Sequence, residues 1–495
     1  MKTKHVTITV LPGKHKLSAP EDSSLLEVLQ QHDLAPDAPC GGQGTCHKCK
    51  VLVDGTEQLA CRTTVRRAMV VERIAADDVA VLTGGDGDVP VADPKEKGLL
   101  LAVDIGTTTV AAWLLDGSTG KELAVVSGLN PQTVFGADVV TRLQLARDGK
   151  LNAEQKAIVK ELDDMVRKLC DKAKVSAKKI RRVCIVGNPT MQQLFLGMGI
   201  ENLVTIPFGP ALTSPDVVPA KEHLKTCPNA DLQLVPDISG YVGADIVAGI
   251  LATDLWHAKD NVLFVDIGTN GEMVLRAKDG RMTACSTAAG PALEGAKIRF
   301  GMRGAPGAID HVSPENDKVV CHVIGGGPAK GICGSGLIDA VAVFLEQGAI
   351  NKRGRIASEE ERDGDRFLPL TDDVWLTQDD IREVMLAKGA IAAGIELMAG
   401  ELGLDLADID RVLLAGAFGS FMDAHSACRI GLLPAVLDGK IAAVGNTAGA
   451  GARRMVCDPS QFASTADLLE QIDFLELGDL PGFRKSFAKN MNFTE

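Results

Sequence analysis

The chain has 495 residues, of which 45% are hydrophobic and 24% charged, and a formal net charge of −13. This length is enough for roughly two to four domains with large cores. The net negative charge argues against nucleic acid as a partner, because phosphate binding needs clustered Lys and Arg. The N-terminal residues lack the apolar core of a signal peptide, and no apolar run reaches the ~18 residues of a membrane span. We therefore expect a cytoplasmic protein with no membrane partner, whose twelve cysteines are reduced or bind metal.

The first elements are a hairpin and a short helix. Apolar and threonine residues alternate over 6–10, which is the period of a strand. A Pro-Gly turn follows, and residues 15–17 can pair back as a second strand. Leucines and a valine spaced along 23–31 predict a short amphipathic helix, and residues 50–53 predict a further strand before an Asp-Gly turn.

A cysteine-rich loop lies between that helix and that strand. It contains Cys40, Cys46 and Cys49, and Cys61 follows eleven residues later. Four thiolates are what a 2Fe–2S cluster needs, and the glycines between the first two cysteines suit a loop whose N–H groups approach sulfide. Structural zinc usually uses two Cys-x-x-Cys hooks, and only Cys46 and Cys49 form one. We favour the cluster over zinc or free thiols, since the hairpin, helix and cysteine loop resemble the β-grasp order of small 2Fe–2S ferredoxins.

We assign residues 1–80 to this ferredoxin domain and residues 81–98 to a linker. The linker is rich in Gly, Asp and Pro and shows no apolar period. From residue 99 the pattern changes to an apolar strand, a Gly/Thr turn and a second strand. The same pattern recurs 162 positions later, with an aspartate ending the first strand each time, Asp104 and then Asp266. Such repetition predicts duplicated subdomains, which we place at 99–255 and 256–495.

The two repeated turns carry a chemistry that suits phosphate. A Gly-centred hairpin directs N–H groups and Thr hydroxyls toward one point, which makes an anion nest. An aspartate at the strand end can hold Mg²⁺ through water, a role we assign to Asp104 and Asp266. One such turn is also compatible with a plain hairpin, but two copies favour a pair that grips the phosphates of ATP. The predicted phosphate contacts are Gly106, Thr107, Thr108, Thr109, Gly268, Thr269, Asn270 and Gly271.

Later segments supply further elements. A buried strand runs into a glycine turn at 416–421, where we expect Gly416 and Gly419 to approach a nucleoside. Residues 442–451 predict a small-residue helix, and residues 153–175 a longer amphipathic one. Thr377 and Asp380 predict a capping box at the start of another helix. A glycine turn at 332–339 opens one more helix.

The order of these motifs resembles the superfamily of acetate and sugar kinases, heat-shock chaperones and actin, with two phosphate motifs and an adenosine motif. Joined to a ferredoxin domain, it resembles the reductive activators of corrinoid proteins, as do segments 241–246, 288–295 and 331–339. Two features depart from the pattern: Ala417 stands where the adenosine motif usually has Gly, and Cys428 and Cys457 are too isolated to hold the 4Fe–4S cluster of some relatives. The resemblance implies an α/β protein: an N-terminal β-grasp 2Fe–2S ferredoxin domain followed by duplicated actin-like (ribonuclease H-like) ATPase subdomains.

The resemblance also implies a function. Such an activator passes one electron from its 2Fe–2S cluster to Co(II) of a corrinoid (cobalamin) protein in a methyltransferase system, regenerating Co(I) at the expense of ATP and Mg²⁺. It takes that electron from a low-potential donor, and relatives form homodimers. The resemblance places Asp245 where it orients or deprotonates the attacking water, although a carboxylate there also suits a helix N-terminus. Ser335 approaches the cobalt or caps its helix, and we favour capping.

Three other functions fit parts of the pattern. The chain is alternatively an ATP-coupled electron donor to another low-potential enzyme, or a small-molecule kinase with an accessory ferredoxin domain. It is also compatible with a redox or nucleotide sensor that turns over little ATP.

Overall fold

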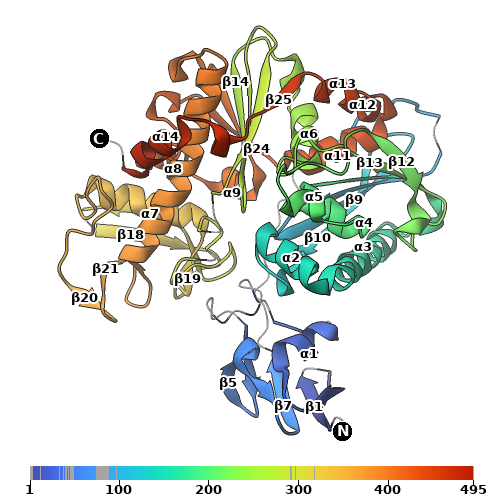
Figure 1. The fold of residues 1–495 in the computed structure, drawn as a ribbon, viewed down its shortest axis with the longest axis horizontal. Coiled ribbons are helices and arrows are strands. Elements are labelled where there is room, and N and C mark those ends of the chain that lie inside the picture. Colours follow the sequence, from blue (N-terminus) through green and yellow to red (C-terminus); the bar gives the residue numbers. More distant parts are fainter. Residues whose placement is uncertain are drawn as a thin grey trace.

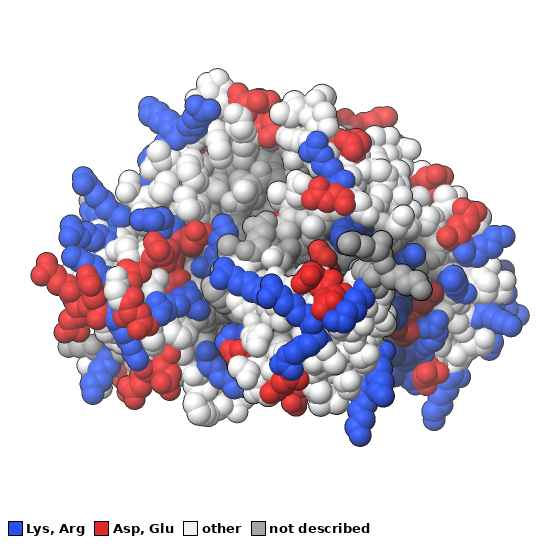
Figure 2. Space-filling view, turned by 60° about the horizontal axis from the view of Figure 1, so that its bottom comes forward, with Lys and Arg blue, Asp and Glu red and all other residues white. Residues whose placement is uncertain are grey.

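The computed structural model describes residues 4–493 apart from 12, 33, 37, 39–41, 43, 45–48, 74–88, 96, 290, 291, 296 and 317. Figure 1 shows a small N-terminal unit beneath two larger α/β halves. Figure 2 turns that small unit toward the viewer, and acidic and basic side chains are interspersed over this face. No helix among the described residues is long and apolar enough to cross a membrane.

The N-terminal unit is a five-stranded sheet covered by helix α1 (Leu25–Gln31). Strands β1 (His5–Leu11) and β7 (Met69–Arg73) run parallel at its centre, which is the β-grasp arrangement. Leucines and a valine on the inner face of α1 pack on this sheet in a core of their own. The predicted hairpin, helix and strand are therefore confirmed. The sheet order is β2 (His15–Pro20), β1, β7, β4 (Lys50–Val53), β5 (Thr56–Leu59), and a separate two-stranded ladder pairs β3 (Ser23–Ser24) with β6 (Thr64–Val65).

This unit contacts the first large half through α1. Gln30 Nε2 donates to the Val134 carbonyl at 2.5 Å, and the Val134 side chain packs against the ferredoxin core. Half of the predicted linker, residues 81–88 and 96, lies outside the described residues. Its last part lies on the large unit: the Val89 N–H donates to the Gly120 carbonyl (3.2 Å) and the Ala92 N–H to the Cys457 carbonyl (3.2 Å).

The first large half is built on a six-stranded sheet. Strands β8, β9 and β10 form an antiparallel meander, and β11 and β13 extend it in parallel from β8. Helix α3 (Leu151–Ala173) packs against β10, near the predicted helix bounds. The strands in order are β10 (Glu122–Leu129), β9 (Thr109–Asp116), β8 (Leu99–Ile105), β11 (Ile180–Gly187), β13 (Asp231–Leu234) and β12 (Asp216–Pro219).

The second half repeats this topology. Its meander β14–β15–β16 corresponds to β8–β9–β10, and β23 and β24 correspond to β11 and β13. The duplicated sheets that the repeat predicted are thus present. The strands in order are β24 (Ile441–Gly445), β23 (Arg411–Ala415), β14 (Val262–Ile267), β15 (Gly271–Arg276), β16 (Met282–Thr287) and β25 (Ile472–Phe474).

Two equivalent helices join the halves. Helix α6 (Ala244–Ala252) follows β13, and α11 (Thr447–Cys457) follows β24. Small residues let them approach closely: a Cβ on Gly451 would lie 2.1 Å from the Ala248 carbonyl oxygen. The predicted small-residue helix at 442–451 is therefore half wrong, because its first residues form the parallel strand β24 and the helix begins only at Thr447. Alanine and valine are compatible with a strand, and β24 is the edge strand of its sheet, where Ala442 and Ala443 are exposed.

The second half carries a small insertion after β16. It contains a three-stranded sheet, helix α7 (Gly334–Glu346) and a further small sheet before the long helix α8 (Gln378–Glu401). The Thr377–Asp380 capping box at the start of α8 is present as predicted. The C-terminal helix α14 (Phe483–Met491) packs on α8. The insertion's strands are β17 (Ala308–Glu315), β18 (Lys318–Val323), β19 (Gly331–Ile332), β20 (Glu361–Arg362), β21 (Asp365–Pro369) and β22 (Trp375–Thr377).

Candidate nucleotide and electron-transfer site

The first phosphate hairpin joins β8 to β9 and is held by side chains from its own half. Asn130 Nδ2 donates to the Gly106 carbonyl (2.8 Å), and the Asn130 N–H donates to the Thr108 carbonyl (2.9 Å). The buried Arg142 guanidinium donates to the Thr107 carbonyl at 2.5 Å. Because three successive carbonyls of the turn are bonded in this way, the turn is held in one geometry and its N–H groups stay available to a ligand.

The second hairpin joins β14 to β15 and is held differently. Gly268 N–H donates to the Asn270 carbonyl across the turn (2.9 Å), and Gly271 begins the returning strand. The turn after β23 packs directly behind it. Gly416 has φ +84°, and a Cβ there would lie 2.6 Å from Asp266 Oδ1. Only glycine meets both conditions, so Gly416 lets the chain approach Asp266 closely.

Three predicted aspartates belong to one electrostatic group. Asp104 ends β8, Asp266 ends β14, and Asp245 lies in the first turn of α6; all three are half-buried. Desolvation raises the pKa of Asp104 to about 6, although the Asn446 amide, which donates to Asp104 Oδ2 at 2.9 Å, lowers it. Desolvation, with repulsion from Asp104, raises the pKa of Asp266 to about 7.

The pKa of Asp245 also rises to about 7, first through desolvation and then through repulsion from Asp266 and Asp104. A carboxylate of this kind releases and accepts protons near neutral pH, which suits a general base. Repulsion between clustered carboxylates also makes a divalent cation favourable among them. Among the described residues, no three His, Cys, Asp or Glu side chains form a metal site by themselves. This is compatible with Mg²⁺, which is usually held by one or two carboxylates, water and substrate phosphates.

Two further buried carboxyls lie close to this group. Asp237 accepts from the Ala244 N–H (3.2 Å) at the start of α6, and desolvation followed by repulsion from Asp245 raises its pKa well above the usual range. Desolvation, with repulsion from Asp245 and Asp266, also raises the pKa of Glu272. These groups favour their neutral forms without a cation nearby, so they limit the negative charge around Asp245.

One carboxylate bridges the two phosphate hairpins. Thr108 Oγ1 donates to Glu294 Oε2 (3.0 Å), and Thr269 Oγ1 donates to Glu294 Oε1 (3.1 Å). The two hydroxyls come from opposite halves of the molecule, so the predicted pair of hairpins does face a common point. Thr107, which matches Thr269 in the repeat, is used otherwise, since its Oγ1 accepts from Asn188 Nδ2 (2.9 Å).

The glycine turn predicted to approach a nucleoside begins α9 (Gly416–Phe421). Gly419 is packed against Leu414, where a Cβ would lie 2.8 Å from the Leu414 side chain. Gly419 therefore serves close packing of α9 on β23, whereas Gly416 faces the hairpin. The turn adjoins the second hairpin through Gly416, and its predicted contact with a nucleoside stays a prediction.

Two of the four predicted cluster cysteines, Cys40 and Cys46, lie outside the described residues. Cys49 is buried and Cys61 half-buried. Gly42 and Gly44 both have left-handed φ, +87° and +77°, and a Cβ on Gly42 would lie 3.9 Å from that of Cys61. Gly42 thus lies close to Cys61 in a backbone conformation that favours glycine. This arrangement fits a cluster held by a glycine-rich loop.

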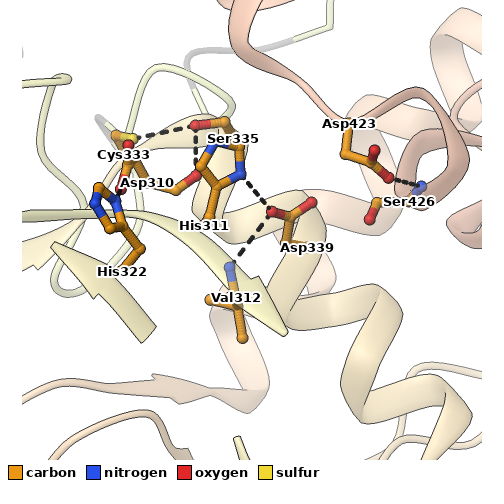
Figure 3. A network of polar contacts seen from close by, with 9 residues as sticks. All are labelled: Asp310, His311, Val312, His322, Cys333, Ser335, Asp339, Asp423 and Ser426. Carbon is orange, nitrogen blue, oxygen red and sulfur yellow. Dashed lines mark hydrogen bonds and ion pairs between the residues drawn. The ribbon is translucent and has the colours of Figure 1, made fainter. Parts of the chain in front are cut away.

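Ser335 does not cap its helix as we had favoured. The N-cap residue of α7 is Cys333, and the buried Ser335 Oγ donates to the Asp310 carbonyl at 2.8 Å (Figure 3). Its neighbour Asp339 lies one turn further along α7 and pairs with His311 (Nδ1 to Oδ2, 3.0 Å). Ser335 therefore fastens α7 to β17 and does not reach the surface in this conformation.

Sequence reasoning missed several residues of this site. Asn446 was placed inside a helix, and Asn130, Arg142 and Asn188 received no role. Glu294 was noticed only as part of a segment that resembles the corrinoid activators. A signal existed for Asn446: it follows the last strand of the second half, as Asp245 follows that of the first.

Comparison with known proteins agrees with this arrangement. Three family models match: a 2Fe-2S iron-sulfur cluster binding domain over 8–69, the RACo middle region over 99–258, and the C-terminal ASKHA domain of RACo over 260–495. The corrinoid activation enzyme RamQ of Eubacterium limosum is 34% identical over 427 residues, which are 81% of this chain and 72% of that protein. The chain belongs to the family of reductive activators of corrinoid proteins.

Two other relatives support this membership. The [Co(II) methylated amine-specific corrinoid protein] reductase of Methanosarcina barkeri is 29% identical over 404 residues, covering 75% of this chain and 72% of the reductase. The solved structure of a reductive activator for corrinoid,iron-sulfur protein superposes with a TM-score of 0.70 and 28% identity, covering 99% of this chain and 98% of that one. The activator family thus combines the ferredoxin domain and the actin-like ATPase domain that the structure shows. A 2Fe–2S cluster and ATP are the ligands that these two domains support.

Proposed function

We propose that this protein uses ATP to drive one electron from its 2Fe–2S centre to Co(II) of a corrinoid protein in a methyltransferase system, yielding Co(I). One observation carries the proposal: two phosphate hairpins face one point in the same chain as a cysteine-loop ferredoxin unit that contacts the first half. The names of the relatives point to the same substrate class. A 2Fe–2S cluster supplies a one-electron centre at roughly −400 mV.

The chain's own residues would bind and activate ATP. Asp104 and Asp266 position Mg²⁺, while the hairpin N–H and hydroxyl groups bind phosphate. Asp245, whose pKa is about 7, takes the proton from the attacking water. The predicted contacts of Gly416 with the nucleoside and of Cys40, Cys46, Cys49 and Cys61 with the cluster complete the assignment.

ATP does not need to contact the cobalt for this coupling. Closure of the two halves around the nucleotide changes which cobalt state of the corrinoid protein binds best. The difference in binding free energy between the two states offsets the uphill electron transfer. About 1.4 kcal/mol offsets 59 mV for one electron, so a difference of roughly 3 kcal/mol offsets about 130 mV. A low-potential donor restores the electron, and we expect a homodimer in the cytoplasm.

The test is cobalt reduction followed by its visible spectrum. Candidate corrinoid proteins are poised as Co(II) and mixed with reduced activator, with and without Mg-ATP. We expect Co(I) only with ATP, and none from Cys46→Ala, which should lose the cluster absorption but keep ATP binding. Equal reduction without ATP across the corrinoid partners would contradict the proposal and favour a simple electron carrier.

Metal analysis tests the cluster independently of the partner. We expect about two irons and about two acid-labile sulfides per chain. About four irons, or tightly bound zinc in their place, would contradict the assignment of the cysteine loop.

A further inference from the structure

Glu294 occupies the point to which both phosphate hairpins donate. Its two carboxylate oxygens each accept from one threonine hydroxyl, Thr108 of the first half and Thr269 of the second, at 3.0 and 3.1 Å. A hydroxyl donates one proton at a time. While Glu294 accepts from them, neither hydroxyl can donate to a phosphate.

A carboxylate and a phosphate cannot share this position. Both are anionic, and both require the same donors, so they compete for one site. A carboxylate that spans two hairpins also holds the halves together when nucleotide is absent. We propose that Glu294 is a latch on the nucleotide-free cleft, which the terminal phosphate of ATP must displace. The inference rests on the proposed function, because it takes ATP as the ligand of the two hairpins.

The loop that carries Glu294 allows this exchange by side-chain rotation. Gly295 has φ +74°, and a Cβ on Gly301 would lie 2.0 Å from the Gly295 carbonyl oxygen, so the loop is folded tightly on itself. A Cβ on Gly334 would likewise lie 2.0 Å from the Leu293 carbonyl oxygen, which fixes the loop against the start of α7. The backbone is held on both sides of Glu294, whereas its half-buried side chain has several rotatable bonds.

The latch predicts in which direction nucleotide affinity changes when Glu294 is removed. If Glu294 competes with phosphate, Glu294→Ala tightens binding of a non-hydrolysable Mg-ATP analogue by about tenfold or more, which is about 1.4 kcal/mol. ADP lacks the terminal phosphate, so its affinity changes less. If Glu294 were instead a ligand of Mg²⁺ or of the nucleotide, the same variant would bind the analogue more weakly.

Calorimetric titration of the full chain with the analogue and with ADP decides between these outcomes. Lys297→Ala is the matched control, because Lys297 lies on the same loop, is exposed and pairs with Glu383 at 3.6 Å rather than with a hairpin; it should bind like the parent. Failure of the parent to bind either nucleotide would overturn the proposed function. Normal binding by the parent with equal or weaker binding by Glu294→Ala would overturn the latch alone.

The nucleotide-free protein offers a second measurement. A double-mutant cycle between Glu294→Ala and Thr108→Val, the pair that joins the two halves, is read by denaturant unfolding without nucleotide and measures whether the two side chains stabilise each other. The latch requires a favourable coupling. Additive effects of the two substitutions would show that the bridge does not hold the cleft and would overturn the proposal even if nucleotide affinity rose.

Discussion

The two ATPase halves share the order of their five core strands, whereas the sixth strand lies at opposite edges of the two sheets and the helices α6 and α11 begin with different polar residues. The helix after the last core strand begins near Asp245 in the first half and after Asn446 in the second. Asn446 donates to Asp104 of the opposite half, and the strongest charge effect on Asp245 comes from Asp266, also of the opposite half. Each helix therefore serves the hairpin of the other half. The duplication supplies the scaffold, and the helix starts differ, since Asp245 lies two residues after the N-cap of α6 whereas Asn446 is itself the N-cap of α11.

The two hairpins are held in place by different kinds of contact. The first is fixed by Asn130 and Arg142 through its backbone carbonyls, and the second packs against the Gly416 turn. Hydrogen-bonded side chains hold a turn in one geometry, whereas close glycine packing depends on how neighbouring elements sit. We infer that the first hairpin is the fixed side of the site and that the second adjusts when the cleft closes.

The largest effect should follow from making the two helix starts chemically alike. Asp245→Asn leaves an amide in both halves and removes the proposed base. We expect the rate of ATP hydrolysis to fall by about 10²–10⁴-fold, with little change in nucleotide affinity. Single-turnover hydrolysis measures this, with unchanged nucleotide affinity as the control for the fold of the ATPase halves. A variant that hydrolyses ATP like the parent would assign Asp245 to helix stabilisation instead.

Asp266, at the second hairpin, should lower the stability of the metal-free protein above neutral pH. Its pKa is about 7 in the folded protein, against a usual 3.8, so the folded state keeps a proton that the unfolded chain loses between these values. The free energy of unfolding therefore decreases as pH rises through this window and stays low above it. Asp266→Asn removes the cost, and we expect it to stabilise the metal-free protein by about 1–4 kcal/mol at pH 8.

The pH dependence provides the control for that prediction. Near pH 5 only part of this cost is present, so Asp266→Asn should stabilise the protein less than at pH 8, and the difference should vanish below pH 3.8, where both states are protonated. The same variant should lose Mg-dependent ATP turnover. Equal stabilisation at both pH values would point to packing rather than charge.

Replacing the glycine behind each hairpin with alanine should lower the stability of the protein by unequal amounts. Gly416→Ala forces a side chain into a left-handed backbone and against Asp266, and we expect a loss of about 2–3 kcal/mol of stability. Gly187 stands at the matching position of the first half. An added Cβ there would lie 2.6 Å from the Ile105 carbonyl oxygen, but the φ of Gly187 is not left-handed. We therefore expect Gly187→Ala to lower stability by about 1–2 kcal/mol. Denaturant unfolding of both variants tests the order, and the reverse order would contradict the role of Gly416.

Much of this arrangement followed from the sequence because it repeats. Two Asp-Ile-Gly-Thr turns after apolar strands predicted two hairpins, and Thr108 and Thr269 do converge on one carboxylate. The ferredoxin order followed from the alternation around Val6–Val10 and from the spacing of leucines in α1. These signals are local, so neighbouring residues alone specify them.

The residues that sequence reasoning missed act over long separations. Asn446 bonds to a side chain 342 positions away, and Glu294 to one 186 positions away. Neither distance leaves a periodic pattern, and only the closed fold brings the partners together. The start of α11 was misplaced for a related reason, since a run of Ala and Val is compatible with either an edge strand or a packed helix, and pairing with β23 decides the outcome.

The smallest expected effect tests the amide that the second half supplies. The Asn446 hydrogen bond lowers the pKa of Asp104, which desolvation otherwise raises. Asn446→Leu should therefore raise that pKa further. Because Mg²⁺ requires the ionised carboxylate, nucleotide affinity should increase with pH through the pKa of Asp104, and the midpoint should lie higher in the variant. We expect a shift of roughly half to one pH unit, equivalent to about 0.7–1.4 kcal/mol.

Titrations with a Mg-ATP analogue between pH 5.5 and 8.5 would show the largest difference from the parent near pH 6 and little at the alkaline end. A uniform loss of affinity at every pH would mean that Asn446 binds the nucleotide itself rather than setting the charge of Asp104.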